Sequence, residues 1–282
     1  MSLFLLAAGS SHFSLGNQKV EKRMGCQQSL QSSEVLKVRT IYINDPLKNT
    51  FCTNSISTTK YSKWSFLPRY LYLQFSKAAN AFFLFITILQ QIPGVSPIGQ
   101  YTTLLPLLVI LAISGIKEVV EDYKRYMADK VVNSKTTSVF RQNSWHVIKW
   151  HEVNVGDIVK TLNEEFLPAD MILISSSEPQ SMCYVATANL DGETNLKIRQ
   201  ASLEVAGIIK EGQLVNLDGK IECEEPDHQF NNFVGTLYLR GKSPISVGPD
   251  QMLLRGTQLK NTQWIIGVVI YTGFETKLMQ VK

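Results

Sequence analysis

No charged residue occurs between Lys77 and Lys117, and this long apolar stretch leaves the chain few possible architectures. A membrane-spanning helix needs about 20 residues, so the stretch is too long for one span and suits two. Residues 93–99, Pro-Gly-Val-Ser-Pro-Ile-Gly, supply a turn between them. We therefore predict membrane-spanning helices from about Tyr70 to Ile92 and from about Gln100 to Val120. The alternative is a buried helical hairpin in a soluble core, where so long an uncharged run is unusual.

Basic residues flank the uncharged stretch on both sides and are absent from its turn. They are Lys60, Lys63, Arg69 and Lys77 before it, and Lys117, Lys124, Arg125 and Lys130 after it. Because cytosolic flanks of membrane helices are enriched in Lys and Arg, we expect both termini in the cytosol. The net charge of +4 is too small to indicate nucleic acid and fits an anionic membrane surface. These features predict an integral membrane protein with both termini in the cytosol.

From Thr136 onward the chain changes to short alternating segments separated by turn residues, which is typical of β-strands. The expected strands cover 137–141, 145–150, 157–161, 171–175, 184–190, 204–209, 220–223, 233–239 and 265–271, with an earlier one at 37–43. The predicted fold class is an α+β membrane protein. A two-helix transmembrane hairpin is followed by a cytosolic all-β domain, a distorted double-sheet sandwich or jelly roll.

The predicted fold divides the chain into five segments. They are a disordered tail at 1–36, a cytosolic juxtamembrane segment at 37–69, the two membrane helices at 70–121, the β domain at 122–275 and the start of a further linker at 276–282. The tail is rich in Ser, Gln and Gly, which disfavours a packed core. The second helix should continue into the cytosol as a charged rod, because Lys117, Glu121 and Arg125 form i,i+4 pairs.

An acidic-glycine turn, Asp191-Gly192-Glu193-Thr194, separates two expected strands at 183–190 and 195–201. Asp-Gly is typical of β-hairpin turns, since glycine adopts positive φ without penalty. We expect Glu193 to be exposed at the tip of this loop, where it can reach another surface. Most Asp-Gly turns are only turns, so the spacing by itself indicates no chemistry.

The first predicted membrane helix contains three polar residues that are candidates for a binding site. Asn80, Gln90 and Gln91 need polar partners within a membrane, which either a neighbouring helix or a lipid headgroup would provide.

The four histidines and four cysteines lack metal-binding spacing, so we predict no metal site. We expect free thiols at Cys26, Cys52, Cys183 and Cys223.

The order of these features resembles the first part of a P-type ATPase. The uncharged hairpin is followed by Val155-Gly156-Asp157-Ile158-Val159, then Leu167-Pro168-Ala169-Asp170, then Asp191-Gly192-Glu193-Thr194. Cation pumps of this superfamily usually have threonine where Asp191 stands, so the loop is similar to the type IV branch, the phospholipid flippases. Further segments resemble the phosphatidylserine-transporting class: Phe66-Leu67-Pro68-Arg69, Ala78-Ala79-Asn80, Leu89-Gln90-Gln91-Ile92-Pro93, Leu253-Leu254-Arg255-Gly256 and Tyr271-Thr272-Gly273. The resemblance covers about Lys37 to Lys282.

This resemblance implies an ATP-driven flippase that moves phosphatidylserine, or phosphatidylethanolamine, from the exoplasmic to the cytosolic leaflet. The β domain would be the actuator domain, in which Glu193 orients the water that hydrolyses an aspartyl-phosphate. Asp191, Gly192 and Thr194 would shape the loop around it. The lipid headgroup would meet Gln90, Gln91 and Asn80. Mg²⁺ and ATP are implied for the complete enzyme and not for this chain, and an accessory β subunit is a further expected partner.

The sequence also departs from the family. The family's phosphorylated aspartate lies in a DKTGT segment, which is absent here, as are the nucleotide-binding domain and the later membrane helices. This chain alone should therefore be inactive as an enzyme, and we expect the N-terminal part of a flippase. The alternative is a truncated, non-catalytic, membrane-anchored β module that binds or regulates full-length partners.

Overall fold

The computed structural model describes residues 38–45, 48–62, 64–92, 99, 101–206 and 217–281. The predicted disordered tail at 1–36 and most of the predicted turn at 93–99 lie outside these residues. The chain divides into two compact units. The β unit contains the described parts of Met1–Asn54 and Thr136–Lys282, and the helical unit contains Ser55–Lys135. These limits differ from the predicted divisions at 37–69 and 122–275, because the chain before the helices contributes to the β unit.

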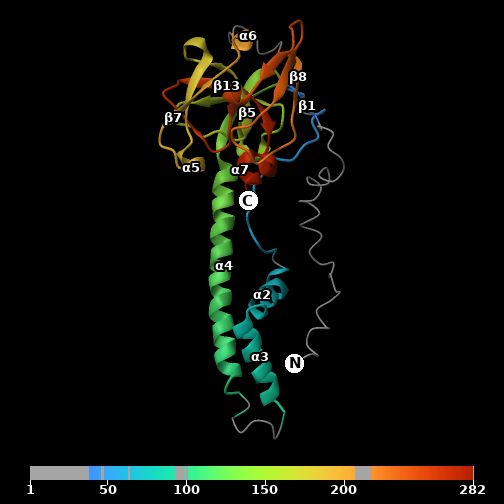
Figure 1. The fold of residues 1–282 in the computed structure, drawn as a ribbon, viewed down its shortest axis with the longest axis vertical. Coiled ribbons are helices and arrows are strands. Elements are labelled where there is room, and N and C mark those ends of the chain that lie inside the picture. The colour runs from blue at the N-terminus through green and yellow to red at the C-terminus, as the bar shows by residue number, and fades with distance from the viewer. Residues whose placement is uncertain are drawn as a thin grey trace. The chain divides into compact units, whose positions relative to one another are not determined.

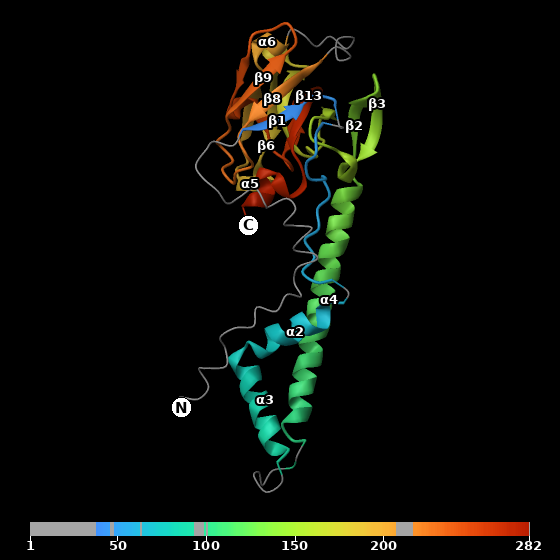
Figure 2. The ribbon, with the colours of Figure 1, turned by 90° about the vertical axis from the view of Figure 1, so that its right-hand side faces the viewer.

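The helical unit contains α2 (Phe66–Phe75), α3 (Ala78–Gln90) and α4 (Leu104–Ser134). The predicted continuous helix from Tyr70 to Ile92 is wrong, since α2 and α3 meet at a bend of 93° (Figure 2). Lys77 has extended backbone angles at this bend, with φ −78° and ψ 125°. The side-chain amide of Asn80 donates to the carbonyl of Gln74 at 3.1 Å, which satisfies a backbone group near the end of α2.

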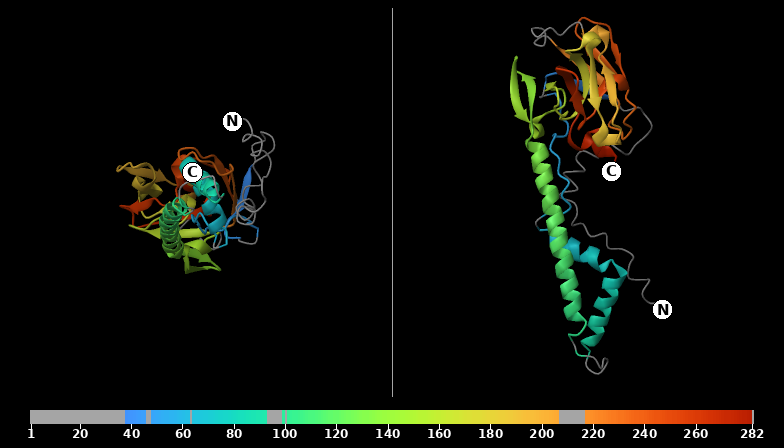
Figure 3. Two further views of the ribbon diagram at one scale, coloured as in Figure 1. Left: turned by 90° about the horizontal axis from the view of Figure 1, so that it is seen from below. Right: turned by 90° about the vertical axis from the view of Figure 1, so that its left-hand side faces the viewer.

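Helix α4 is one uninterrupted helix of 31 residues and extends well past the predicted end at Val120 (Figure 3). The predicted helical continuation with charged i,i+4 pairs is confirmed, with Lys117 and Arg125 lying 3.7 Å and 3.8 Å from the carboxylate of Glu121, and its cytosolic location stays a prediction. Among the described residues, no individual helix has the length and apolarity that a membrane crossing needs, whereas α2 and α3 reach that measure together as a bent pair. The transmembrane hairpin therefore stays a prediction.

The β unit contains three antiparallel sheets. The first has the order β1 (Arg39–Tyr42), β8 (Gly219–Cys223), β9 (Gly235–Leu239), β10 (Ile245–Val247). The second has the order β11 (Met252–Leu253), β5 (Asp170–Ser176), β13 (Trp264–Tyr271), β4 (Ile158–Leu162), β2 (Thr136–Arg141), β3 (Ser144–Lys149). The third has the order β12 (Gln258–Lys260), β6 (Met182–Ala186), β7 (Leu196–Gln200).

Short helices complete this unit: α5 (Ala188–Asp191), α6 (Leu203–Ala206), α7 (Lys277–Gln280) and 3₁₀ turns at Trp150–Glu152, Pro179–Ser181, Pro249–Gln251 and Gly273–Glu275.

Strands β5 and β13 lie in the middle of the β unit (Figure 1). They separate two apolar clusters of buried side chains. Ile172 and Val268 face one cluster, whereas Met171 and Val269 face the other. Successive side chains of a strand point to opposite faces, so both faces of these two strands are covered, and the residues between Asp170 and Ser175 in β5 and most of β13 are apolar. Burying each such aliphatic side chain contributes about 1.5–3 kcal/mol to folding. This central pair gives the loops of the β unit a rigid base.

Most predicted strands are present, and outside the acidic loop three predictions for this unit are wrong. The sheets number three in the described residues rather than two. The strand expected at 204–209 begins instead as helix α6, and residues 207–209 lie outside the described part. Cys183 and Cys223 are free and buried as predicted, but Cys52 is disulfide-bonded.

Candidate functional site

The acidic loop joins the paired strands β6 and β7 and begins with the single helical turn α5, labelled in Figure 1. The carbonyl of Thr187 accepts hydrogen bonds from the N–H groups of Leu190 and Asp191, which closes this turn. Gly192 ends it with φ 75°, the left-handed conformation that commonly terminates helices. The Asp-Gly pair is therefore a helix end. The predicted strand to Leu190 and the predicted hairpin turn at this pair are both wrong.

Glycine at position 192 is required by backbone conformation and not by lack of space. A Cβ atom added there would meet no atom within 4 Å. Glycine adopts φ near 75° without the strain that a side chain introduces, and other residues adopt it rarely. The backbone next to Glu193 is thus bare on its open side, and another surface can approach it closely.

Glu193 is exposed, as the sequence predicts, with 61% of its side-chain surface accessible. Its backbone N–H donates to Asp191 Oδ1 at 3.0 Å, which fixes the start of the segment that leaves the helix. Lys197 on β7 reaches back to both carboxylates, with Nζ 2.6 Å from Asp191 Oδ2 and 3.0 Å from Glu193 Oε2. Thr194 is exposed beside them. The loop therefore presents two carboxylates held by one lysine.

The charges of this trio stabilise one another. The hydrogen bond from Lys197 holds the pKa of the Asp191 carboxyl below its usual range, and the backbone N–H of Glu193 acts in the same direction. The same two carboxylates raise the pKa of Lys197. Because all three side chains are accessible to solvent, the pairs orient the loop more than they stabilise the fold. The sequence alone did not predict this contact of Lys197.

The candidate headgroup residues do not form one cluster. Gln90 is buried, and its Oε1 accepts a hydrogen bond from the hydroxyl of Thr103, just before α4. Gln91 is exposed beside it at the end of α3. Asn80 is bound to Gln74 across the bend, and the α-helical rise places it about 15 Å from Gln90 along α3. The described residues of this unit therefore do not bring all three side chains into one headgroup site.

A buried polar cluster, which sequence analysis missed, joins three of the quoted motifs around Asn54. The Asn54 amide nitrogen donates to the carbonyls of Trp150 at 2.7 Å and Pro168 at 3.1 Å. Its oxygen accepts from Arg255 Nη1 at 2.6 Å and from the N–H of Gly273 at 3.0 Å. Asn54 thus uses its full hydrogen-bonding capacity. No local pattern in the polar segment around it marks this residue.

Asp170 is the second centre of this cluster and is fully buried. Its two oxygens accept the backbone N–H groups of Arg255 and Lys277, both at 2.7 Å. Burial raises the pKa of Asp170 to about 6, although these two N–H groups and the charges of Arg255 and Lys277 oppose the shift. Burial also lowers the pKa of Arg255 to about 10, against the pull of Asp170. The cluster fastens residues from four distant parts of the chain.

The part of the chain that the structure describes contains no candidate metal-binding site, because no group of three His, Cys, Asp or Glu side chains lies together there. Lys197 occupies the space between the two carboxylates of the acidic loop, where a cation would otherwise bind. The residues of this loop therefore do not fit a divalent cation by themselves.

Comparison with known families gives two matches. A model of the phospholipid-translocating ATPase N-terminal region matches residues 41–104, and a model of the P-type ATPase actuator domain matches residues 131–282. The second match contains the acidic loop and most of the buried polar cluster.

Curated relatives agree with these matches. The phospholipid-transporting ATPase C887.12 of Schizosaccharomyces pombe is 46% identical over 264 residues, which is 93% of this chain and 21% of the relative. The phospholipid-transporting ATPase DRS2 of Saccharomyces cerevisiae is 47% identical over 86% of this chain and 18% of its own length. The phospholipid-transporting ATPase tat-1 of Caenorhabditis elegans is 47% identical over 81% of this chain and 20% of its own length. The chain thus spans about a fifth of these relatives.

Proposed function

Because the chain belongs to the P-type ATPases, in their phospholipid-transporting branch, we propose that it supplies the N-terminal membrane and actuator part of an ATP-driven flippase. The cargo is phosphatidylserine, with phosphatidylethanolamine as a second substrate, moved from the exoplasmic to the cytosolic leaflet. An accessory subunit, a location in the Golgi, endosomal or plasma membrane, and cytosolic termini belong to the same proposal. ATP and Mg²⁺ act in the complete enzyme.

Glu193 acts in hydrolysis of the aspartyl-phosphate. Its carboxylate orients a water molecule and accepts one proton while the water oxygen bonds to phosphorus and the bond from phosphorus to the aspartate oxygen breaks. Two features support this role: the exposure of Glu193 and the bare backbone of Gly192 beside it. Asp191 fixes the loop through the N–H of Glu193, and Thr194 lies next to the site.

Lys197 matters for the approach of this loop to a phosphate. Two carboxylates would meet strong repulsion from a phosphorylated aspartate, and unit charges 4 Å apart interact by about 4 kcal/mol near a protein surface. The ammonium of Lys197, which contacts both carboxylates, halves the net charge that the loop brings. The loop therefore enters with an oriented carboxylate and reduced repulsion.

The lipid headgroup meets Gln91 and Gln90 at the end of α3. An amide donates to a phosphate or carboxylate without the desolvation cost of a buried full charge. Exposure of Gln91 supports the first contact, and Gln90 becomes available when its bond to Thr103 opens. Asn80 contributes indirectly, by holding the bend between α2 and α3.

The observation that carries the proposal is the exposed, lysine-oriented carboxylate of Glu193. Its test is Glu193→Gln in the complete enzyme that contains this chain. We expect the phosphorylated form to decay at least about a hundredfold more slowly, since general-base catalysis contributes about 10²–10⁴-fold. Glu204→Gln changes an exposed glutamate on α6 and serves as control. Unchanged decay of the Glu193→Gln phosphoenzyme would remove the assigned role.

A further inference from the structure

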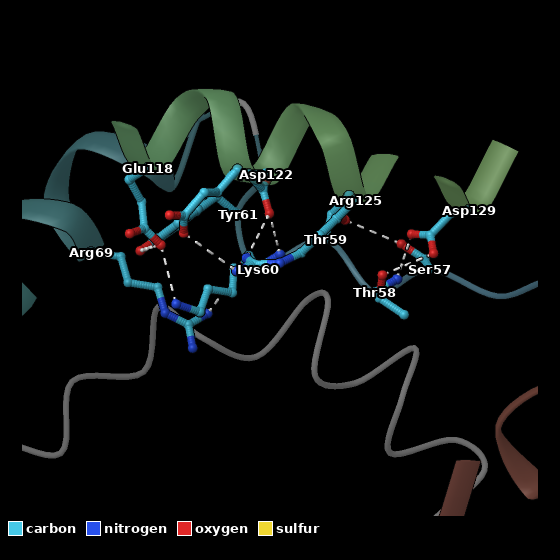
Figure 4. A network of polar contacts seen from close by, with 11 residues as sticks. Ser57, Thr58, Thr59, Lys60, Tyr61, Arg69, Glu118, Asp122, Arg125 and Asp129 are labelled. Atoms are coloured by element: carbon cyan, nitrogen blue, oxygen red, sulfur yellow. Dashed lines mark hydrogen bonds and ion pairs between the residues drawn. The ribbon is translucent and has the colours of Figure 1, made fainter. Parts of the chain in front are cut away.

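The extended segment 56–61, here called the strap, lies along one face of α4 (Figure 4). That face consists of residues spaced four, three, four and four positions apart, which brings them onto one side of a helix. They are Glu118, Asp122, Arg125, Asp129 and Asn133. Both strap and α4 belong to the helical unit, so their contact is defined within one compact body.

Alternate residues of the strap donate their backbone N–H groups to this face. Ile56 donates to Asn133 Oδ1 at 3.0 Å, Thr58 to Asp129 Oδ2 at 2.6 Å and Lys60 to Asp122 Oδ1 at 2.7 Å. In an extended chain every second N–H points the same way, at a spacing of about 6.6 Å. Asn133 and Asp129 lie about one turn apart on α4, or about 6 Å, which matches that spacing. Asp129 and Asp122 lie about two turns apart, or about 10.5 Å, so their side chains reach towards each other to meet the N–H groups of Thr58 and Lys60. Side chains of α4 thus take the place of a partner strand.

Side chains of the strap add a second set of contacts. The hydroxyl of Thr58 donates to Asp129 Oδ1 at 2.8 Å, and the amide of Asn133 donates to the carbonyl of Ile56 at 2.7 Å. Glu118 accepts from both Lys60 Nζ at 3.1 Å and the Tyr61 hydroxyl at 3.0 Å. The strap is therefore held at both ends and in the middle.

Two carboxylates of α4 show that this face is specialised. Asp129 is buried with 9% exposure, and the N–H and hydroxyl of Thr58 occupy its two oxygens. Burying a carboxylate costs free energy unless hydrogen-bond donors satisfy it. The two donors of Thr58 therefore stabilise Asp129 in its buried position. Glu121, the neighbour of Asp122 in the sequence, is 42% exposed and pairs with Lys117 and Arg125, both of which belong to α4 itself. Glu121 therefore gives a matched control.

The chain passes between the β unit and the helical unit at two points, after Asn54 and after Lys135. The first point comes directly before the strap in the sequence, and the second comes directly after α4. We propose that Asp122 and Asp129 are positioning residues that bind the strap to α4, so that both connections move as one body. In the proposed flippase, on which this role rests, that body converts movement of the actuator into movement of the lipid-transporting helices.

The first test measures the strap in this chain, held in phosphatidylcholine nanodiscs. In Asp122→Ala/Asp129→Ala we expect the amides of Thr58 and Lys60 to exchange hydrogen at least about tenfold faster, because their acceptors are lost. Glu121→Ala should leave them unchanged, and Asp129→Asn, which keeps one acceptor oxygen, should retain part of the protection. Unaltered exchange of β5 and β13 will show that the β unit is folded. Unchanged exchange of Thr58 and Lys60 in the double variant would overturn the proposal.

The second test measures coupling in the complete enzyme. We expect Asp122→Ala/Asp129→Ala to lower the number of lipids moved per ATP hydrolysed at least about threefold, while the phosphoenzyme decays at its normal rate. Glu121→Ala should keep the normal ratio. An unchanged ratio with a released strap would overturn the mechanical role. Failure of the Glu193 assignment would instead appear as unchanged decay in Glu193→Gln, so the two proposals fail separately.

Discussion

Lys197 controls the charge of the acidic loop through its ammonium contacts with Asp191 and Glu193. Lys197→Met should raise the pKa of Asp191 towards its ordinary value, because a nearby cation favours the ionised carboxylate and its loss does the reverse. The measurement is a carbon-13 NMR titration of the Asp191 carboxyl in this chain. Lys197→Arg should keep the pKa low, and Lys260→Met, which removes a partner of Glu164 instead, should leave it unaltered. An unshifted Asp191 in Lys197→Met would contradict the contact.

At the level of single residues, the sequence predicted that Glu193 is exposed but did not predict its ion pair with Lys197. Exposure of Glu193 follows from its place in a short polar loop between two strands, which is local information. The contact with Lys197 depends on how β7 pairs with β6 after the loop, with Val185 opposite Lys197, and this register is a tertiary property. The helical form of residues 188–191 was missed for a related reason: Asp-Gly suits a hairpin and a helix end equally.

At the level of elements, Asn54 joins the residues before β4 and β5 to those after β11 and β13. Asn54→Ala should lower the free energy of unfolding of the β unit by about 3–5 kcal/mol, because four buried groups lose their partner and one of them is the charged Arg255. Urea unfolding of the chain in nanodiscs, followed by tryptophan fluorescence, measures this loss, since Trp150 is buried beside Asn54.

The control for this experiment is Asn163→Ala, at an exposed turn of the same unit. A change at such a surface site should stay within about 0.5 kcal/mol. Equal stability of Asn54→Ala and Asn163→Ala would show that the buried cluster contributes little. The cluster would then be a by-product of packing rather than the fastening that its hydrogen bonds indicate.

The elements that the sequence predicted well are those with strong local periodicity. The apolar runs of β5 and β13 and the charged spacing in α4 determine their own secondary structure. The bend at Lys77 was missed because the segment from Tyr70 to Ile92 has the length of one membrane helix, whereas the bend depends on a side-chain bond between Asn80 and Gln74. The short strands β10, β11 and β12 were missed because two or three residues carry no readable period.

At the level of the whole molecule, the β unit is assembled from chain segments that precede and follow the helical unit in the sequence. Strand β1 pairs with β8 along Arg39–Tyr42, and Thr272 donates its hydroxyl to the carbonyl of Cys52 at 2.6 Å. The segment before the helices is thus part of the β unit's sheet and core, which a division by hydropathy assigned to a separate juxtamembrane region. Pairing between segments so far apart in sequence leaves no mark in either segment alone.

Asp170 should make the stability of this assembled unit depend on pH. Its folded-state pKa of about 6 lies above the unfolded value, so the folded state binds the proton more tightly. The stability that this proton contributes is present at pH 4.5 and is lost as the pH rises through 6. Asp170→Asn should therefore cost about 2 kcal/mol more at pH 4.5 than at pH 7.5, measured by urea unfolding at both values. Asp250→Asn, at a carboxylate with 84% exposure, serves as the surface control at both values. Equal costs for Asp170→Asn at the two values would mean that its carboxyl is ionised throughout, and that the N–H groups of Arg255 and Lys277 outweigh its burial.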